Sequence, residues 1–216
     1  MKAHQMLLSA CLVLASPLAL AGDIGPAQSS LERFSAGLES LHARFSQRVV
    51  TQEGVVENEG EGEVWLQTPG LFRWASEGDY PELIVADGQY IWIYDEMLEQ
   101  VTVKPQSEAA EDSPLLLLTD PAGLEEQFTI TEAGQHQGID LLTLQSSNPE
   151  SEFDRVLLGF DQGQLVLMSL EDAFGLRTEI RFSELVRNLP LDPGLFRFEP
   201  PPGTDVVGET PDSPDA

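Results

Sequence analysis

The sequence predicts a mainly β protein, built on one strongly curved antiparallel β-sheet of about eleven strands. Apolar residues recur at period two in short runs from Arg44 to Leu185, and short turns rich in Gly, Pro and Asp join the runs. Helical spacing occurs only near the N-terminus and in the middle of the chain. A sheet of this kind has a concave face that short lid helices can cover, so we expect an apolar cavity there.

The N-terminal stretch predicts a secretory signal peptide over residues 1–21. Lys2 precedes an apolar run that is interrupted by Pro17 and closes on Ala19-Leu20-Ala21, and the run is too short to span a bilayer. Cys11, in "LSAC", resembles the site at which bacterial lipoproteins are acylated, but most of the apolar core follows it. We therefore expect Cys11 to be removed, which leaves no cysteine for disulfides, thiol chemistry or zinc.

The remaining chain reads as a single domain over 22–207, followed by an acidic, Pro-containing tail over 208–216 without fixed structure. The 37 acidic residues outnumber the 11 basic ones and give a net charge of −26. This charge argues against nucleic acid as a partner. It is compatible with attraction to basic protein surfaces and with adaptation to a salty habitat.

The first elements are a helix and six strands. Ser29 and Ser30 are candidate N-caps, and Leu31, Phe34, Leu38, Leu41 and Phe45 recur every three or four residues, which predicts one amphipathic helix to about Ala43. Period-two runs then predict strands at "RFSQRVV", "GEVWLQ", "LFRWAS", "ELIVAD", "YIWIYD" and "EQVTVK".

The middle segment "EAAEDSPLLLLTDPAGLEEQF" predicts two short helices, which begin near Ser113-Pro114 and Asp120-Pro121. Strands are expected to resume at "FTITEA", "IDLLTLQ", "RVLLGF", "QLVLMSLED" and "RTEIRFSEL", with a final short run at "LFRFE".

The stretch "QYIWIYDE" is apolar at both parities. Tyr90, Trp92 and Tyr94 alternate with Ile91 and Ile93, so the strand needs cover on both faces. One of these faces is expected to form a cavity wall.

Residues for catalysis are scarce beyond the signal peptide. His42, expected inside the first helix, and His136 are the two histidines there, and the sequence contains no nucleophile-elbow, zinc-protease, phosphate-loop or EF-hand motif. We predict no enzyme activity, metal or cofactor, although a pair of carboxylates leaves a hydrolase as a less favoured alternative. Glu57, Glu59, Glu61 and Glu63 share one strand face, which predicts a solvated surface, a strip for a basic partner or a weak calcium site.

Five segments resemble the LolA family of periplasmic outer-membrane lipoprotein carriers. They are "HARFSQRV", "GEGEVWLQTPGLFRW", "LIVADGQYIWIYDEMLEQV", "SPLLLLTDP" and "LFRFEPPPGTDV", in family order over about Ser29 to Val207. The resemblance implies that the curved sheet is an unclosed antiparallel β-barrel, with short lid helices over an apolar cavity. It also implies a monomeric periplasmic chaperone that binds the acyl chains of lipoproteins. The cargo would come from an inner-membrane ABC transporter and pass to a receptor at the outer membrane.

The resemblance also implies which residues contact acyl chains. The expected cavity residues are Val49, Trp65, Phe72, Trp74, Ile84, Trp92, Leu115, Leu116, Leu118 and Met168. Well-studied members carry an arginine immediately before the proline of the "P-x-x-F" stretch, which is Pro69 to Phe72 here. That arginine ties the lid to the barrel. Here Thr68 occupies that position, and Thr68 and Leu117 are the expected latch residues. Arg73, on the opposite strand parity from Phe72 and Trp74, is a poor substitute for the arginine. A weaker latch is therefore expected.

Two alternatives share the fold. An outer-membrane receptor would need a correctly placed lipidation cysteine, and a lipoprotein-binding stress sensor would usually need a second domain that this chain does not accommodate.

Overall fold

The computed structural model describes residues 25–109, 121–148, 151 and 153–208. The described elements are α1 (Pro26–Ser35), β1 (Ser40–Val50), β2 (Val56–Gln67), β3 (Leu71–Glu77), β4 (Glu82–Ala86), β5 (Tyr90–Asp95), β6 (Gln100–Pro105), α2 (Gln106–Ala109), α4 (Pro121–Gln127), β7 (Phe128–His136), β8 (Ile139–Ser146), β9 (Arg155–Asp161), β10 (Gln164–Glu171), β11 (Arg177–Arg187), η2 (Pro193–Phe196) and β12 (Asp205–Gly208).

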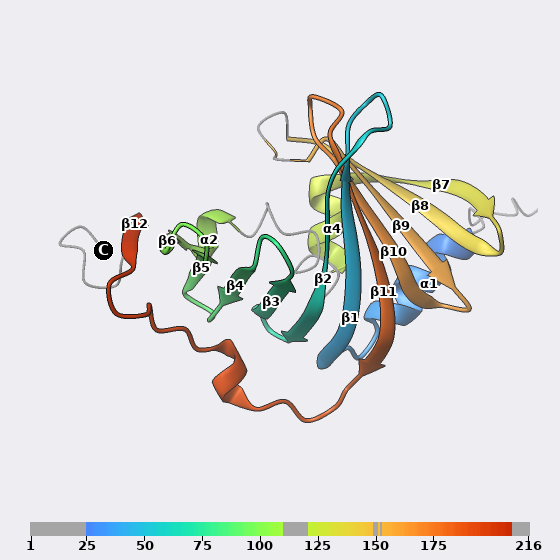
Figure 1. Cartoon of the computed structure of the whole chain (residues 1–216). Helices are drawn as coiled ribbons and strands as arrows, with labels where there is room; N and C mark the ends of the chain where they lie inside the picture. Colours follow the sequence, from blue (N-terminus) through green and yellow to red (C-terminus); the bar gives the residue numbers. More distant parts are fainter. Residues whose placement is uncertain (1–24, 110–120, 149–150, 152, 209–216) are drawn as a thin grey trace, which may run out of the picture.

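The described strands form one twelve-stranded sheet in the order β12-β6-β5-β4-β3-β2-β1-β11-β10-β9-β8-β7. Neighbouring strands are antiparallel except β12, which runs parallel to β6. The edge strands β12 and β7 lie at opposite sides of the molecule (Figure 1), so the curved sheet does not close. The predicted fold class is confirmed.

The N-terminal helix is shorter than predicted. It begins at Pro26, after Gly25, and ends at Ser35, before Gly37 turns the chain with a φ of +64°. Leu41 and Phe45 match a helical spacing of four, but together with Ala43 they also match a spacing of two, and the structure uses them as buried residues of β1. The prediction of helix to Ala43 was therefore wrong, and His42 lies on a strand.

The middle of the chain confirms one of the two predicted helices. α4 begins at Pro121, as expected from Asp120-Pro121. The helix predicted from Ser113 lies outside the described residues. The short helix α2, a single turn that directly follows β6, was not predicted from the sequence.

The C-terminal segment was also predicted incorrectly. "LFRFE" is not a strand, since its first two residues end the 3-10 helix η2, and an unpredicted short strand, β12, adds to the edge of β6. After β11 the chain runs along one side of the sheet to reach that edge (Figure 1). Gly208, the first residue of the expected tail, is the last residue of β12, and residues 209–216 lie outside the described residues.

Two apolar clusters explain why so many strands are apolar on both faces. The larger lies on the concave face and includes Phe45, Phe72, Trp74 and Ile91. The smaller lies on the convex face of β4–β6 and consists of Val85, Trp92, Val101 and Val103, with Leu83, Tyr90, Tyr94 and Phe198 packed against it. The C-terminal segment therefore supplies the cover that the second face of β5 needs, because the Phe198 ring packs on Trp92 and Tyr94.

Candidate functional site

The concave face of β1–β5 is lined almost entirely by apolar side chains. Strand parity and cross-strand register place them together, since Phe45 lies opposite Gly62, Val64 opposite Trp74, and Trp74 opposite Ile84. The lining residues are Ala43, Phe45, Val64, Leu66, Phe72, Trp74, Ile84, Ala86, Ile91 and Ile93. Ile84 and Ile93 face each other across β4 and β5 and stay half-buried.

Aromatic rings form the centre of this lining. The Phe45 and Trp74 rings stack with 3.7 Å between their centroids, and Phe72 lies 6.4 Å from Trp74. The intervening strand β2 has Gly62 between them, and a Cβ there would lie 2.8 Å from Phe45 and 2.0 Å from the Ala75 carbonyl oxygen. The missing side chain of Gly62 thus makes room for the stack.

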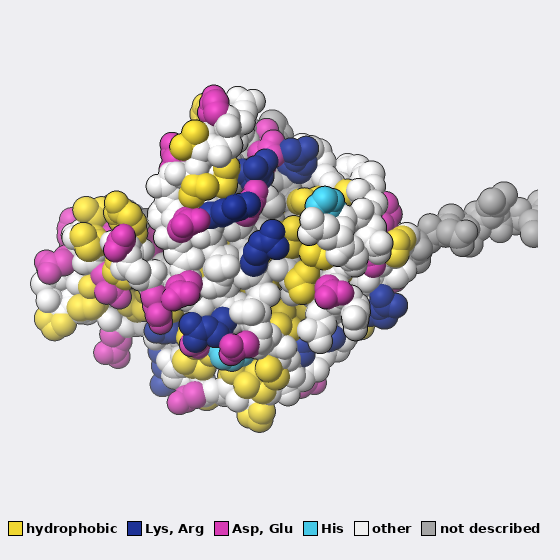
Figure 2. Space-filling model, turned by 45° about the vertical axis from the view of Figure 1, so that its right-hand side comes forward, with side chains coloured by type: hydrophobic (Ala, Val, Ile, Leu, Met, Phe, Trp, Pro, Cys, Tyr) yellow, Lys and Arg dark blue, Asp and Glu magenta, His cyan; other side chains and the backbone are white. Residues whose placement is uncertain are grey.

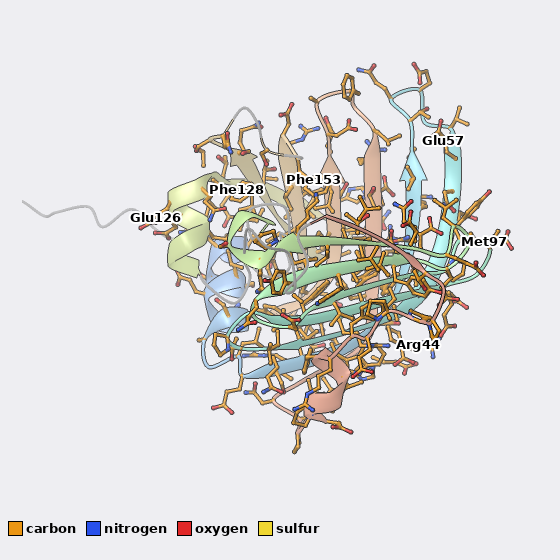
Figure 3. The ribbon with its side chains drawn as sticks, turned by 90° about the vertical axis from the view of Figure 1, so that its left-hand side faces the viewer. Arg44, Glu57, Met97, Glu126, Phe128 and Phe153 are labelled. Carbon is orange, nitrogen blue, oxygen red and sulfur yellow. The ribbon has the colours of Figure 1, made fainter. Side chains whose placement is uncertain are left out.

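The other half of the concave face is filled by the protein itself. α1 contacts β7–β10 and buries Ala27, Leu31 and Phe34 there, with the Phe34 ring 6.2 Å from Phe160. α4 adds the buried Leu124. Figure 3 shows Glu126 of α4 and Phe128 at the opposite end of the molecule from Met97 and Glu57. The main sheet contacts of α1 are with β7–β10, and those of α4 are with β7.

The structure brings together four of the predicted cavity residues on or beside this lining. Phe72, Trp74 and Ile84 belong to it, and Val49 lies on the same face of β1, half-buried opposite Asn58 and Thr178. Met168 also faces inward, but it is 1% exposed and lies in the core between Leu158 and Ile180. Leu115, Leu116, Leu117 and Leu118 lie outside the described residues.

Two predicted cavity residues point the other way. Trp65 alternates with the inward-facing Val64 and Leu66, and Trp92 alternates with Ile91 and Ile93. Trp92 belongs to the convex cluster, where its Nε1 donates to Asp87 Oδ2 at 2.8 Å. Both tryptophans are corrected to the convex face, because adjacent strand residues point to opposite faces and no bulge interrupts the register from β2 through β3 and β4 to β5.

Trp65 belongs to a polar cluster on the convex face. The His42 imidazole stacks on its ring with 5.2 Å between centroids, and His42 Nε2 lies 3.0 Å from Glu63 Oε2. Arg73 lies 6.0 Å from the Trp65 ring centroid and donates to the Leu195 carbonyl at 3.2 Å. Partial burial lowers the pKa of Arg73. As expected from its parity, Arg73 faces away from Phe72 and Trp74, and it holds the C-terminal segment.

Thr68 has a structural role among the described residues. Its hydroxyl lies 3.1 Å from both the Leu38 and Glu39 carbonyl oxygens, and its backbone N–H donates to Glu39 at 2.9 Å. It thereby holds the end of β2 against the connection between α1 and β1. The Thr68 hydroxyl has a single proton to donate, and it is directed to these carbonyls, whereas a guanidinium carries several N–H donors.

The charged groups do not assemble a metal site in the described parts of the chain. No group of three or more His, Cys, Asp and Glu residues is placed there to hold a metal ion. Burial, together with the charge of Asp95 opposite it, raises the pKa of the Glu82 carboxyl group. The predicted strip Glu57–Glu63 does alternate along β2, and its last member is engaged by His42 and, at 3.9 Å, by Arg44.

The sequence analysis missed several members of the lining, chiefly Phe45, Val64, Leu66, Ile91 and Ile93. A usable signal was present, because once Phe72 and Trp74 are assigned to the inner face, the short hairpins carry that parity to the neighbouring strands. Helices long and apolar enough to cross a bilayer do not occur in the described ranges.

Comparison with known proteins agrees with this architecture. The family model described as outer membrane lipoprotein carrier protein LolA matches residues 36–199. An outer-membrane lipoprotein carrier protein of Dechloromonas aromatica is 40% identical over 206 residues, which cover 95% of this chain and 97% of the relative. One of Xanthomonas campestris is 39% identical over 199 residues, covering 91% and 95%.

A solved structure shows the same fold at low identity. An uncharacterized conserved protein from Thermus thermophilus superimposes with a TM-score of 0.55 at 16% identity, covering 85% of this chain and 99% of that protein. The family match spans most of the chain, and the relatives align over nearly their whole length. The chain therefore belongs to the LolA family of outer-membrane lipoprotein carrier proteins.

Proposed function

We propose that the protein is a periplasmic carrier that holds the acyl chains of lipoproteins against its concave face on their way to the outer membrane. The observation that carries this proposal is the continuous apolar lining of β1–β5, with Phe45, Phe72 and Trp74 at its centre. A half-barrel with such a lining and a charged outer face suits a long apolar ligand. A member of this carrier family is a chaperone and not an enzyme.

The energetics of acyl burial favour a regulated cover. Each buried methylene contributes about 0.8 kcal/mol, so one acyl chain of roughly fifteen methylenes gains on the order of 10 kcal/mol. A cargo with several chains would be held too tightly to release unless the empty carrier first had to give up internal contacts. We propose that a lid makes these internal contacts by burying its own leucines when the carrier is empty. The lid residues are Leu115, Leu116, Leu117 and Leu118.

The partners follow from the same proposal. The carrier accepts acylated lipoproteins from an inner-membrane ABC transporter, delivers them to an outer-membrane receptor and acts as a monomer. Residues 1–21 direct it to the periplasm and are then removed. It needs no cofactor, because the energy for extracting the cargo comes from the transporter.

Native mass spectrometry tests the proposal directly. The protein is mixed with a purified triacylated lipoprotein in detergent below its micelle concentration. We expect a one-to-one complex with the acylated cargo and none with the same lipoprotein lacking its acyl chains. Failure to bind any acylated cargo would refute the carrier function.

Site-specific photo-crosslinking tests the face. A photoreactive phenylalanine analogue at Ile84 or Ile93 is expected to capture acylated cargo, because both side chains face the concave lining and are half-buried. Leu83 is the matched control, since it is equally half-buried on the same strand and faces the convex cluster. Crosslinks of equal yield from Leu83 and Ile84 would show that the cargo does not use the concave face.

A further inference from the structure

A hollow lies on the convex face, over strands β8–β11 and β1. Its volume is about 500 Å³, and its walls are Arg48, Thr143, Arg155, Leu157, Leu167, Ser169, Glu171, Arg177, Glu179 and Arg181. The register confirms the grouping, because Arg48 lies opposite Glu179, Glu179 opposite Ser169, and Glu171 opposite both Arg155 and Arg177. Figure 2 shows dark blue side chains gathered on this exposed sheet face with magenta ones beside them.

The charge of this hollow is opposite to that of the chain. Four of the eleven basic residues meet there, all of them arginines, in a protein with a net charge of −26. Two carboxylates face them. Arg48 Nη2 lies 2.6 Å from Glu179 Oε2, Arg177 Nε donates to Glu179 Oε1 at 2.9 Å, and Arg155 pairs with Glu171.

Positive charge is left over after these pairs form. Within the described residues Arg181 makes no ion pair, and Glu179 is shared between two guanidinium groups. Burial opposes ionisation of Glu179, but the hydrogen bonds and charges of Arg48 and Arg177 outweigh it and lower its pKa. Arginines held this close repel one another, so the arrangement is one that an added anion would stabilise.

The shape of the surface selects the kind of anion. An adjoining hollow shares Arg48, Glu179 and Arg181, and its other charged lining residues are all acidic, namely Glu59, Glu61, Glu77 and Asp79. A broad anionic surface such as a membrane would meet these carboxylates before it reached the arginines. A narrow protein segment that carries carboxylates can enter the hollow without meeting the surrounding acidic residues. Its carboxylates match the forked donors of arginine, and its apolar atoms can pack on Leu157 and Leu167.

We propose that this convex hollow docks an acidic segment of a protein partner. The surface lies on the opposite face of the sheet from the lining of Phe45, Phe72 and Trp74, so the two can be occupied together. A partner bound there would hold the carrier without blocking the entry or exit of cargo. The inference therefore goes beyond the carrier function and is independent of it.

The test uses a fluorescently labelled hexaglutamate peptide and the purified protein at low ionic strength. A chain with this net charge repels oligoglutamate unless a local site captures it, so binding detected by anisotropy is informative. We expect binding that weakens with added salt. Arg155→Gln and Arg181→Gln should each reduce the affinity about tenfold, the effect of losing one charge-assisted hydrogen bond. Arg197→Gln, an exposed arginine outside the hollow, should leave it unchanged.

Four outcomes would overturn the proposal. They are absence of binding, an equal loss in the Arg197→Gln protein, preferential binding of phosphatidylglycerol vesicles or inorganic phosphate through the same arginines, and self-association that Arg181→Gln abolishes. The last would make a second copy of the chain the occupant. Cargo capture by native mass spectrometry, measured on the same variants, should stay intact, which separates failure of this site from failure of the carrier function.

Discussion

The Phe45 ring stacks on the Trp74 indole across the intervening strand β2, with 3.7 Å between ring centroids. The two residues are 29 positions apart in the chain, and Gly62 is the residue of β2 over which they meet. This relationship links three strands on the face that we assign to acyl chains. Because Gly62 has no side chain, any side chain added at this position would disturb the packing of the lining.

Gly62→Ala should destabilise the protein, because the new methyl group would meet the Ala75 carbonyl oxygen at 2.0 Å and the Phe45 ring at 2.8 Å. We expect the free energy of unfolding in urea to fall by about 1–3 kcal/mol, the usual effect of overpacking. Gly60→Ala on the same strand is the matched control, since its nearest neighbour would be 3.6 Å away. Equal losses for the two variants would contradict this account of the stack.

Glu132→Ala should loosen α1. The Glu132 carboxylate accepts hydrogen bonds from the Gln28 backbone N–H at 2.8 Å and the Ala27 N–H at 3.4 Å, at the first turn of a helix whose N-cap is Gly25. Loss of this cap should lower the free energy of unfolding by about 1 kcal/mol, with a smaller loss for Glu132→Gln, which keeps an acceptor. Hydrogen exchange of the α1 amides, compared with the exposed Glu53→Ala variant, gives the measurement. Unchanged α1 protection in Glu132→Ala would disprove the cap.

Trp92→Ala should act on stability and not on cargo. Trp92 is 8% exposed on the convex face, and its loss would leave a cavity between Phe198 and β5, costing about 3–5 kcal/mol. Trp92→Phe keeps most of the ring and should cost about 1 kcal/mol through the lost hydrogen bond to Asp87. Proteolysis of the segment after η2 should accelerate in both, whereas Phe174→Ala, at a residue 90% exposed, should change nothing. Reduced acyl capture by a folded Trp92→Phe protein would instead place Trp92 in the site.

Glu82→Gln should stabilise the protein at neutral pH. The pKa of Glu82 is raised in the folded state by burial and by Asp95, so folding favours the protonated carboxyl. The unfolded chain binds fewer protons at this group, and the charged form therefore costs stability above the folded-state pKa, a cost that disappears as the pH falls below the unfolded value. Unfolding curves at neutral and acidic pH should show a gain for Glu82→Gln that shrinks in acid. The exposed Glu96→Gln variant should show no such trend, and a gain independent of pH at Glu82 would rule out this cause.

Strand existence was predictable because period two is a local property. All eleven runs from "RFSQRVV" to "RTEIRFSEL" became strands, and their hairpin spacing was enough to imply one curved antiparallel sheet, whereas the family resemblance implied that the sheet is unclosed. The helix boundary was less predictable, since Leu41 and Phe45 satisfy a helical and a strand spacing together, and Gly37 decided between them. The same ambiguity placed His42 on the wrong element.

The faces of the strands needed long-range information. The segment "YIWIYD" indicates that both faces of β5 are apolar, but it does not indicate which face is concave. Trp65 and Trp92 were predicted to face the cavity, whereas in the structure Trp92 packs against Phe198, which is 106 residues away in the chain. The C-terminal cover carries little regular pattern, because it packs through isolated rings and one short strand.

By itself, the sequence determined the strand content, the acidic charge, the residue types of the lining and the family, since each of these follows from composition, local periodicity or segment order. Only the tertiary structure decided which alternate residues line the concave face and which arginines share a hollow. The reason is physical. Curvature gives a sheet its inside, and cross-strand register brings Arg48, Arg155 and Arg181 together from three strands, whereas the sequence lists them as isolated charges.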